Sequence, residues 1–171
     1  MLLLPLIGED IYTTEKIFNE NHVSKGGFLY SLSSQPSRKD LVDFDIKVYT
    51  LKNTADSNPL GYVKVTLHAH KDVSDSELLY YEDVSEALYI SQCAVMKNYQ
   101  KGGLGKVMFD LLFRMYPDKI FLSHVSVRNL PSLKLHYRHN FKKLGVYQSE
   151  DFYGYGGYVS DLVIRHPARG S

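Results

Sequence analysis

Residues 89–114 decide the fold of this chain, and they read Tyr-Ile-Ser-Gln-Cys-Ala-Val-Met-Lys-Asn-Tyr-Gln-Lys-Gly-Gly-Leu-Gly-Lys-Val-Met-Phe-Asp-Leu-Leu-Phe-Arg. Residues 89–95 form an apolar run typical of a buried strand, and a polar, glycine-rich turn follows. Apolar side chains then continue in a helical segment that ends before Pro117, because proline cannot continue a helix. The stretch therefore predicts a strand, a loop and a helix.

The loop of this unit has the composition of an anion-binding site. Its three glycines, at positions 102, 103 and 105, allow backbone N–H groups to turn inward. The first N–H groups of a helix lack intrahelical acceptors, and the helix dipole adds partial positive charge there. A phosphate or pyrophosphate is the expected occupant, with added charge from Lys101 and Lys106. Many glycine-rich loops are plain turns, so the spacing has to identify the ligand.

Two motifs resemble those of one enzyme family. The spacing fits neither a P-loop nor a dinucleotide fingerprint. Gln100-x-x-Gly103-x-Gly105 instead resembles the acyl-CoA pyrophosphate loop of the GNAT family of N-acyltransferases, whose pattern is Arg/Gln-x-x-Gly-x-Gly/Ala. Asn129-x-x-Ser132-x-x-x-His136-x-x-x-x-Phe141 is similar to the second motif of that family, Asn-x-x-Ala/Ser-x-x-x-Tyr-x-x-x-Gly-Phe.

Length, composition and element order fit the same family. The chain has 171 residues, enough for one well-buried domain, and its 44% hydrophobic content is that of a folded protein. We expect an α/β fold in which residues 1–171 form a single acyl-CoA N-acyltransferase domain. Its GNAT-like mixed sheet would have a central antiparallel meander and a splayed parallel strand pair, flanked by helices.

The remaining elements are predicted from periodicity and from turn residues. Strands are expected at residues 1–7, 44–49, 62–70, 120–127, 144–147 and 158–164, and helices at 11–19 and 132–140. The strand at 120–127 should lie parallel to the strand at 89–95, because a helix connects them. Asp10 and Asn129 are the N-cap candidates. Residues 23–40 predict a helical turn or a mobile loop near an acceptor site, and residues 72–83 a solvated connection.

The resemblance implies acetyl-CoA as co-substrate. The backbone of the strand end would pair with the pantetheine arm, the loop would hold the pyrophosphate, and the second motif would contact the far side of the cofactor. The residues so assigned are Cys93, Ala94, Val95, Gln100, Lys101, Gly102, Gly103, Leu104, Gly105, Lys106, Asn129 and Ser132. For Asn129 the alternative is a plain helix cap, and the two roles are compatible.

Four residues are candidates for proton transfer. The family tyrosine that donates to the leaving CoA thiolate is replaced by His136, and Tyr137 comes one residue later, about 100° around the helix. Either side chain could be the acid. His124 is the candidate base, because its ordinary pKa near ~6.5 suits neutral operation, and Tyr89 could share a water with it. The alternative for His124 is a core histidine.

The amine acceptor is the least determined part of the sequence. The Tyr89 and His124 spacing, with Tyr153, Tyr155 and Tyr158 in a late hairpin, is similar to protein N-terminal acetyltransferases of the family, in which such a hairpin clamps the peptide. A protein or peptide α-amine is therefore our leading hypothesis. A small-molecule amine and an aminoacyl-tRNA stay open. The alternatives from other classes are a non-catalytic CoA-binding sensor or interaction module, and a phosphate-binding loop for another nucleotide.

Charge and cysteine content limit the partners. A net charge of +1 gives no electrostatic footprint for nucleic acid, although a tRNA-borne acceptor is not excluded. The single cysteine, Cys93, rules out an internal disulfide framework and favours the cytoplasm. The apolar N-terminus is too short to span a membrane. His68 and His70 share a strand face but lack further ligands at suitable spacing, so no metal is expected. The oligomeric state is left open.

Overall fold

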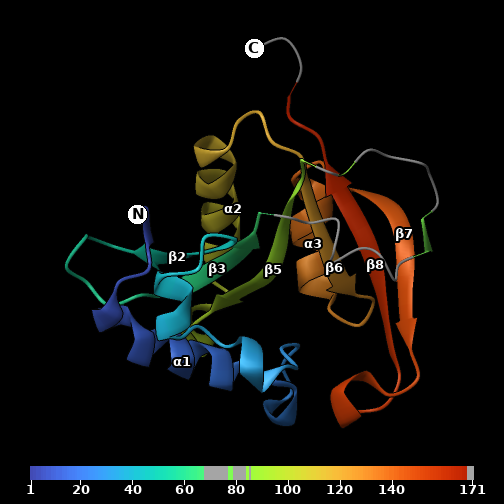
Figure 1. Ribbon diagram of the computed structural model, residues 1–171, viewed down its shortest axis with the longest axis horizontal. Coiled ribbons are helices and arrows are strands. Elements are labelled where there is room, and N and C mark those ends of the chain that lie inside the picture. Colours follow the sequence, from blue (N-terminus) through green and yellow to red (C-terminus); the bar gives the residue numbers. More distant parts are fainter. Residues whose placement is uncertain (68–76, 79–83, 85, 169–171) are drawn as a thin grey trace. The chain divides into compact units, whose positions relative to one another are not determined.

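The computed structural model describes residues 1–67, 77–78, 84 and 86–168 (Figure 1). The chain divides into two compact units. The first unit consists of Met1–Val65 and Ser91–Met115, and the second of Thr66–Ile90 and Tyr116–Ser171. Strand β5 (Leu88–Val95) contributes its first three residues to the second unit and the rest to the first.

The first unit carries two helices on a sheet whose strand order is β1-β2-β3-β5. Its strands are β1 (Leu2–Pro5), β2 (Ile46–Lys52), β3 (Gly61–Thr66, of which Thr66 belongs to the second unit) and the end of β5. Its helices are α1 (Ile11–Glu20) and α2 (Leu104–Met115). Three short 3-10 turns follow α1, namely η2 (Val23–Lys25), η3 (Leu32–Ser34) and η4 (Arg38–Leu41).

Helices α1 and α2 cover opposite faces of this sheet. Tyr62 packs into a buried cluster with Ile17 and Phe18 of α1. A Cβ atom on the preceding residue, Gly61, would lie 3.2 Å from the sulfur of Met108 in α2. Successive residues of a strand point to opposite faces, so the two helices lie on different sides.

The second unit has the strand order β5-β6-β8-β7-β4 and one helix, α3 (Leu130–Arg138). Its other strands are β4 (Glu77–Leu78), β6 (Phe121–Ser126), β7 (Lys142–Ser149) and β8 (Tyr158–Arg165). Strand β6 is parallel to β5 and antiparallel to β8. The parallel register covers only Leu88, Tyr89 and Ile90 of β5, although that strand continues to Val95.

The mixed α/β fold with one parallel strand pair confirms the prediction from sequence, as do the strand, loop and helix around β5 and α2. Asn129 is the N-cap of α3, and Asn140 adopts the left-handed conformation (φ 67°) that asparagine tolerates. Helix α3 begins and ends two residues earlier than expected. The turns η2, η3 and η4 show that helical turns occupy the range 23–40.

Three expectations need correction. Phe44 lies outside β2 and is 87% exposed, because the Asp43 carboxylate accepts the N–H of Asp45 and keeps this segment in a turn. The Asp10 carboxylate does not cap α1, since it is buried against the Lys52 ammonium at 2.9 Å. Strand β3 ends at Thr66, and His68 and His70 lie outside the described residues. The connection expected at residues 72–83 also lies outside the described residues, apart from β4. A strand at this position was not predicted from the sequence.

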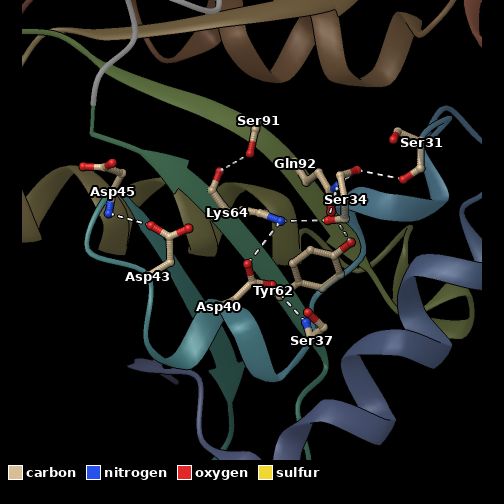
Figure 2. A network of polar contacts seen from close by, with 10 residues as sticks. All are labelled: Ser31, Ser34, Ser37, Asp40, Asp43, Asp45, Tyr62, Lys64, Ser91 and Gln92. Carbon is tan, nitrogen blue, oxygen red and sulfur yellow. Dashed lines mark hydrogen bonds and ion pairs between the residues drawn. The ribbon is translucent and has the colours of Figure 1, made fainter.

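A buried polar network joins the turns η3 and η4 to β3 and β5 in the first unit (Figure 2). The carbonyl of Ser34 accepts from Lys64 Nζ at 2.8 Å and from Gln92 Nε2 at 3.0 Å. Lys64 also lies 3.5 Å from the Asp40 carboxylate, and Tyr62 donates to Gln92 Oε1 at 2.8 Å. Burial lowers the pKa of Lys64, while the nearby Asp40 charge opposes that change. Figure 2 shows the side chains of Tyr62, Lys64 and Gln92 reaching from two strands toward the loop that carries Ser34 and Asp40.

Within the described residues, no helix has the length and apolar composition that a membrane crossing requires. The same part of the chain contains no group of three or more His, Cys, Asp or Glu side chains arranged to hold a metal ion.

The buried ion pair predicts the energetic cost of removing one charge. Lys64→Met should lower the free energy of unfolding by about 3 kcal/mol, because Asp40 then stays buried without its cation. The double variant Lys64→Met/Asp40→Asn should recover a large part of that loss. Urea unfolding measures both. Lys106→Met is the matched control, because Lys106 pairs with Asp110 at the surface, and it should cost less than about 0.5 kcal/mol. Equal losses for the Lys64 and Lys106 variants would contradict this account.

Candidate functional site

The glycine-rich loop lies in the first unit and leads directly into α2. Residues 101–103 form an exposed turn, and the helix begins at Leu104. Gly103 has a φ of 77°, and a Cβ atom built on it would meet nothing within 4 Å. The position therefore combines a conformation that favours glycine with open space, as an anion cradle requires.

The two loop lysines differ in their surroundings. Lys101 is exposed in the turn, whereas the Lys106 ammonium is 2.7 Å from the Asp110 carboxylate one helical turn later. This ion pair partly neutralises Lys106. The first-turn N–H groups and Lys101 are therefore the main positive features that the loop presents to an anion.

The end of β5 carries a cluster of side-chain amides that the sequence did not reveal. Asn21, which follows α1, donates from Nδ2 to the Val95 carbonyl at 3.1 Å. Gln100 Nε2 donates to Asn21 Oδ1 at 2.7 Å and to the same Val95 carbonyl at 3.3 Å. Gln100 and Val95, both assigned to acetyl-CoA by sequence, are thus brought together by a third residue.

The alternation of β5 divides its side chains between two faces. Gln92 and Ala94 are buried, while Cys93 and Val95 are half-buried on the other face. Burial raises the pKa of the Cys93 thiol to about 12, so it stays protonated at neutral pH. A protonated thiol is a poor nucleophile. The backbone of this strand is therefore better suited to bind a ligand than the Cys93 side chain is to react with one.

In the second unit, Tyr89 and His124 are in direct contact. The parallel register pairs Tyr89 with Leu122, and Leu122 comes two residues before His124 in β6. The Tyr89 hydroxyl is 2.8 Å from His124 Nδ1. From the sequence we predicted that the two side chains could share a water, and the direct hydrogen bond is a closer arrangement. Burial lowers the pKa of His124 to about 4, and the imidazole is therefore neutral at neutral pH.

Aromatic rings continue from His124 into the late hairpin of the same unit. The ring centroid of Tyr147 lies 5.7 Å from that of His124 and 6.0 Å from that of Phe152. Phe152 stacks on Tyr158 with centroids 4.0 Å apart and contacts Tyr153 at 4.5 Å. The structure thus places Tyr153 and Tyr158 in this aromatic row.

Tyr155 is half exposed at the tip of the hairpin. Tyr147 and Phe152 were not predicted as site residues from the sequence. Tyr147 ends the strand expected at 144–147, and Phe152 stands beside the tyrosines of the hairpin. Both are aromatic residues close in sequence to the hairpin tyrosines, and this proximity could have identified them as site residues.

Helix α3 holds the residues of the second motif. The Asn129 side chain accepts the N–H of Ser132 at 3.3 Å, which is the expected cap. His136 Nδ1 donates to the Ser132 carbonyl at 2.7 Å, and burial lowers the pKa of His136 to about 4. A neutral, buried imidazole does not carry the proton that an imidazolium acid needs. This finding weighs against His136 as the proton donor.

Tyr137 is 41% exposed and donates to Asp161 Oδ2 at 2.9 Å. Burial, with this carboxylate, raises the pKa of Tyr137 to about 12. Asp161 pairs with Val125 across the strands, whereas His124 pairs with Leu162. Directly opposite residues share a face, so Tyr137 and His124 belong to opposite faces of this sheet. The candidate acid and the candidate base are therefore separated by the sheet itself.

A model of the acetyltransferase (GNAT) family matches residues 18–141. The chain belongs to this family. It is accordingly an acyl-CoA-dependent acetyltransferase, which transfers an acetyl group from acetyl-CoA to an amine. No curated protein sequence matches the chain at a significant level.

Many solved structures share the fold. Arabidopsis thaliana NAA60 in complex with a bisubstrate analogue is 18% identical, with a TM-score of 0.67 and coverage of 99% of both chains. The ribosomal-protein-S18-alanine N-acetyltransferase of Escherichia coli is 12% identical, with a TM-score of 0.66 and coverage of 99% of this chain and 96% of that one. At such identities the likeness concerns the fold.

Gly103 provides a direct test of the loop. Gly103→Val should weaken acetyl-CoA binding at least tenfold, because a β-branched residue is strained at positive φ and adds methyl groups inside the cradle. Isothermal titration calorimetry measures the affinity. Gly26→Val is the matched control, since Gly26 has a φ of 80° and equally open surroundings. An acetyl-CoA affinity that is the same in both variants would contradict the assignment of the loop.

Proposed function

We propose that this acetyltransferase acts on the α-amine of a protein or peptide in the cytoplasm. The observation that carries the proposal is the Tyr89 and His124 pair, with a neutral imidazole at one end of the aromatic row through Tyr147 and Phe152. The free thiol of Cys93 is consistent with a reducing compartment. NAA60 and the ribosomal-protein-S18-alanine enzyme are N-acetyltransferases of the same fold, which supports the choice by analogy.

The pKa of His124 favours an α-amine over a lysine side chain. An ammonium has no lone pair, so the acceptor must lose a proton before it attacks. At neutral pH about one α-amine in ten is uncharged, but fewer than about one lysine amine in a thousand. A base with a pKa of about 4 removes a proton from either ammonium only at a high cost, and the cost is greater for lysine. The site therefore suits an amine that is already partly neutral.

The residues then take the following roles. The backbone at Cys93, Ala94 and Val95 would hold the pantetheine arm, and the loop from Gln100 to Lys106 the pyrophosphate. Asn129 and Ser132 would contact the cofactor from α3. Tyr153, Tyr155 and Tyr158 would hold the peptide, because tyrosine offers a flat apolar face and a hydroxyl to a backbone. Acetyl transfer forms the amide C–N bond and breaks the thioester C–S bond, so that CoA leaves as a thiolate and the amine nitrogen gives up one proton to solvent.

A matched pair of peptides tests the acceptor. One peptide has a free α-amine and an internal lysine, and the other has the same sequence with an acetylated α-amine. We expect release of CoA thiol with the first peptide and at least tenfold slower release with the second. Spermidine serves as a small-molecule amine. Turnover of spermidine alone would contradict the peptide assignment, and acetyl-CoA binding without turnover of any amine would favour the sensor.

The pH dependence of kcat/KM provides a second test. Since His124 stays neutral above a pH of about 4, its titration should not appear near pH 6.5. The rate should instead fall tenfold per pH unit below about 8, as the α-amine of the free peptide becomes protonated. The assay uses the free-amine peptide from pH 5.5 to 9. A break near pH 6.5 that is lost in His124→Gln would show that the imidazole titrates, contrary to this account.

A further inference from the structure

Asn21 occupies an unusual position between the first helix and the cofactor-binding elements of the first unit. It directly follows α1, and its Nδ2 donates to the Ile17 carbonyl at 2.8 Å, as a C-terminal cap does. The same Nδ2 donates to Val95, and Oδ1 accepts from Gln100. Both amide hydrogens and the amide oxygen are thus used, each with a different residue.

The backbone of Asn21 is held as firmly as its side chain. The Leu29 N–H donates to the Asn21 carbonyl at 3.0 Å. Gly27 packs so closely that a Cβ atom there would lie 1.9 Å from the Asn21 carbonyl oxygen. The neighbouring Glu20 carboxylate accepts the N–H of Lys97, at the start of the loop, at 3.1 Å. The end of α1 is therefore fixed to the segment that joins β5 to α2.

The chemistry of the amide limits which residue can act here. Asparagine donates to one carbonyl while it accepts from another amide. An aspartate at this position would place a carboxylate oxygen against the Val95 and Ile17 carbonyls, which also have no proton to give. Alanine would remove the 3.1 Å bond from Asn21 to the Val95 carbonyl and keep the longer bond from Gln100, at 3.3 Å.

We propose that Asn21 is a positioning residue for acetyl-CoA, which fixes the orientation of the Val95 peptide and of the Gln100 side chain. Val95 lies at the end of β5 and Gln100 is the first residue of the loop, and both are assigned to the cofactor. Asn21 acts through them and does not need to touch the cofactor. The inference rests on the acetyl-CoA part of the proposed function and is independent of the acceptor.

The role predicts an unequal effect on two ligands. Val95 is assigned to the pantetheine arm, so loss of Asn21 should harm the binding of that arm most. Calorimetry with acetyl-CoA and with adenosine 3′-phosphate 5′-diphosphate, which lacks pantetheine, separates the two parts. We expect Asn21→Ala to weaken acetyl-CoA at least tenfold and the nucleotide less than threefold. Asn21→Asp, which is nearly isosteric, should give the same pattern.

Two controls separate positioning from stability. Asn19→Ala changes an exposed asparagine of the same helix and should leave both affinities unchanged. Thermal unfolding of each variant reports the loss of the helix cap. Equal weakening of both ligands, or unchanged acetyl-CoA affinity in folded Asn21→Ala and Asn21→Asp, would overturn the proposal. If the unaltered protein failed to bind acetyl-CoA, the proposed function would fall with it.

Discussion

The turns η3 and η4 of the first unit are held in place by hydrogen bonds to the carbonyl group of Ser34. This partly buried carbonyl accepts from Lys64 and from Gln92, two buried side chains that come from neighbouring strands and need a hydrogen-bond partner there. Lys64 in turn needs Asp40, because a buried ammonium without a counter-charge is costly. The turns η3 and η4 are therefore held by polar groups that cannot be exchanged one at a time. An apolar contact would tolerate sliding, whereas this network specifies one arrangement.

Strand β5 links this network to Val95 and Gln100, two residues that we propose to bind the cofactor. Gln92 points into the network, and the carbonyl of Val95, three residues later, receives Asn21 and Gln100. The segment between α1 and β2 is thus tied to β5 at two places, once through Asn21 and once through Ser34. A rigid strand with two such attachments holds its backbone groups in a fixed direction, which is the condition that acetyl-CoA binding along a strand requires.

Sequence patterns predicted most of the fold because the relevant signals are local. The strand, loop and helix around β5, and the cap at Asn129, each depend on residues within a few positions of one another. The polar contacts were not predictable in the same way. Asn21 and Val95 are 74 positions apart, and a local pattern in the sequence cannot predict a hydrogen bond between residues so far apart. His124 was recognised from its place in a strand, but its lowered pKa follows from burial that only the folded chain defines.

The same pKa values constrain the end of the reaction. The departing thiolate is the conjugate base of a thiol with an ordinary pKa of about 8.5. His136 is neutral and already donates from Nδ1 to the Ser132 carbonyl, so it has no spare proton to deliver. Tyr137 has a pKa of about 12, and transfer of its proton to a weaker base is uphill. A neutral phenol can still stabilise a thiolate by donating a hydrogen bond, provided that it leaves Asp161. Tyr137 is therefore better suited to hydrogen bonding than to proton transfer, and the thiolate can take its proton from solvent after the amide has formed.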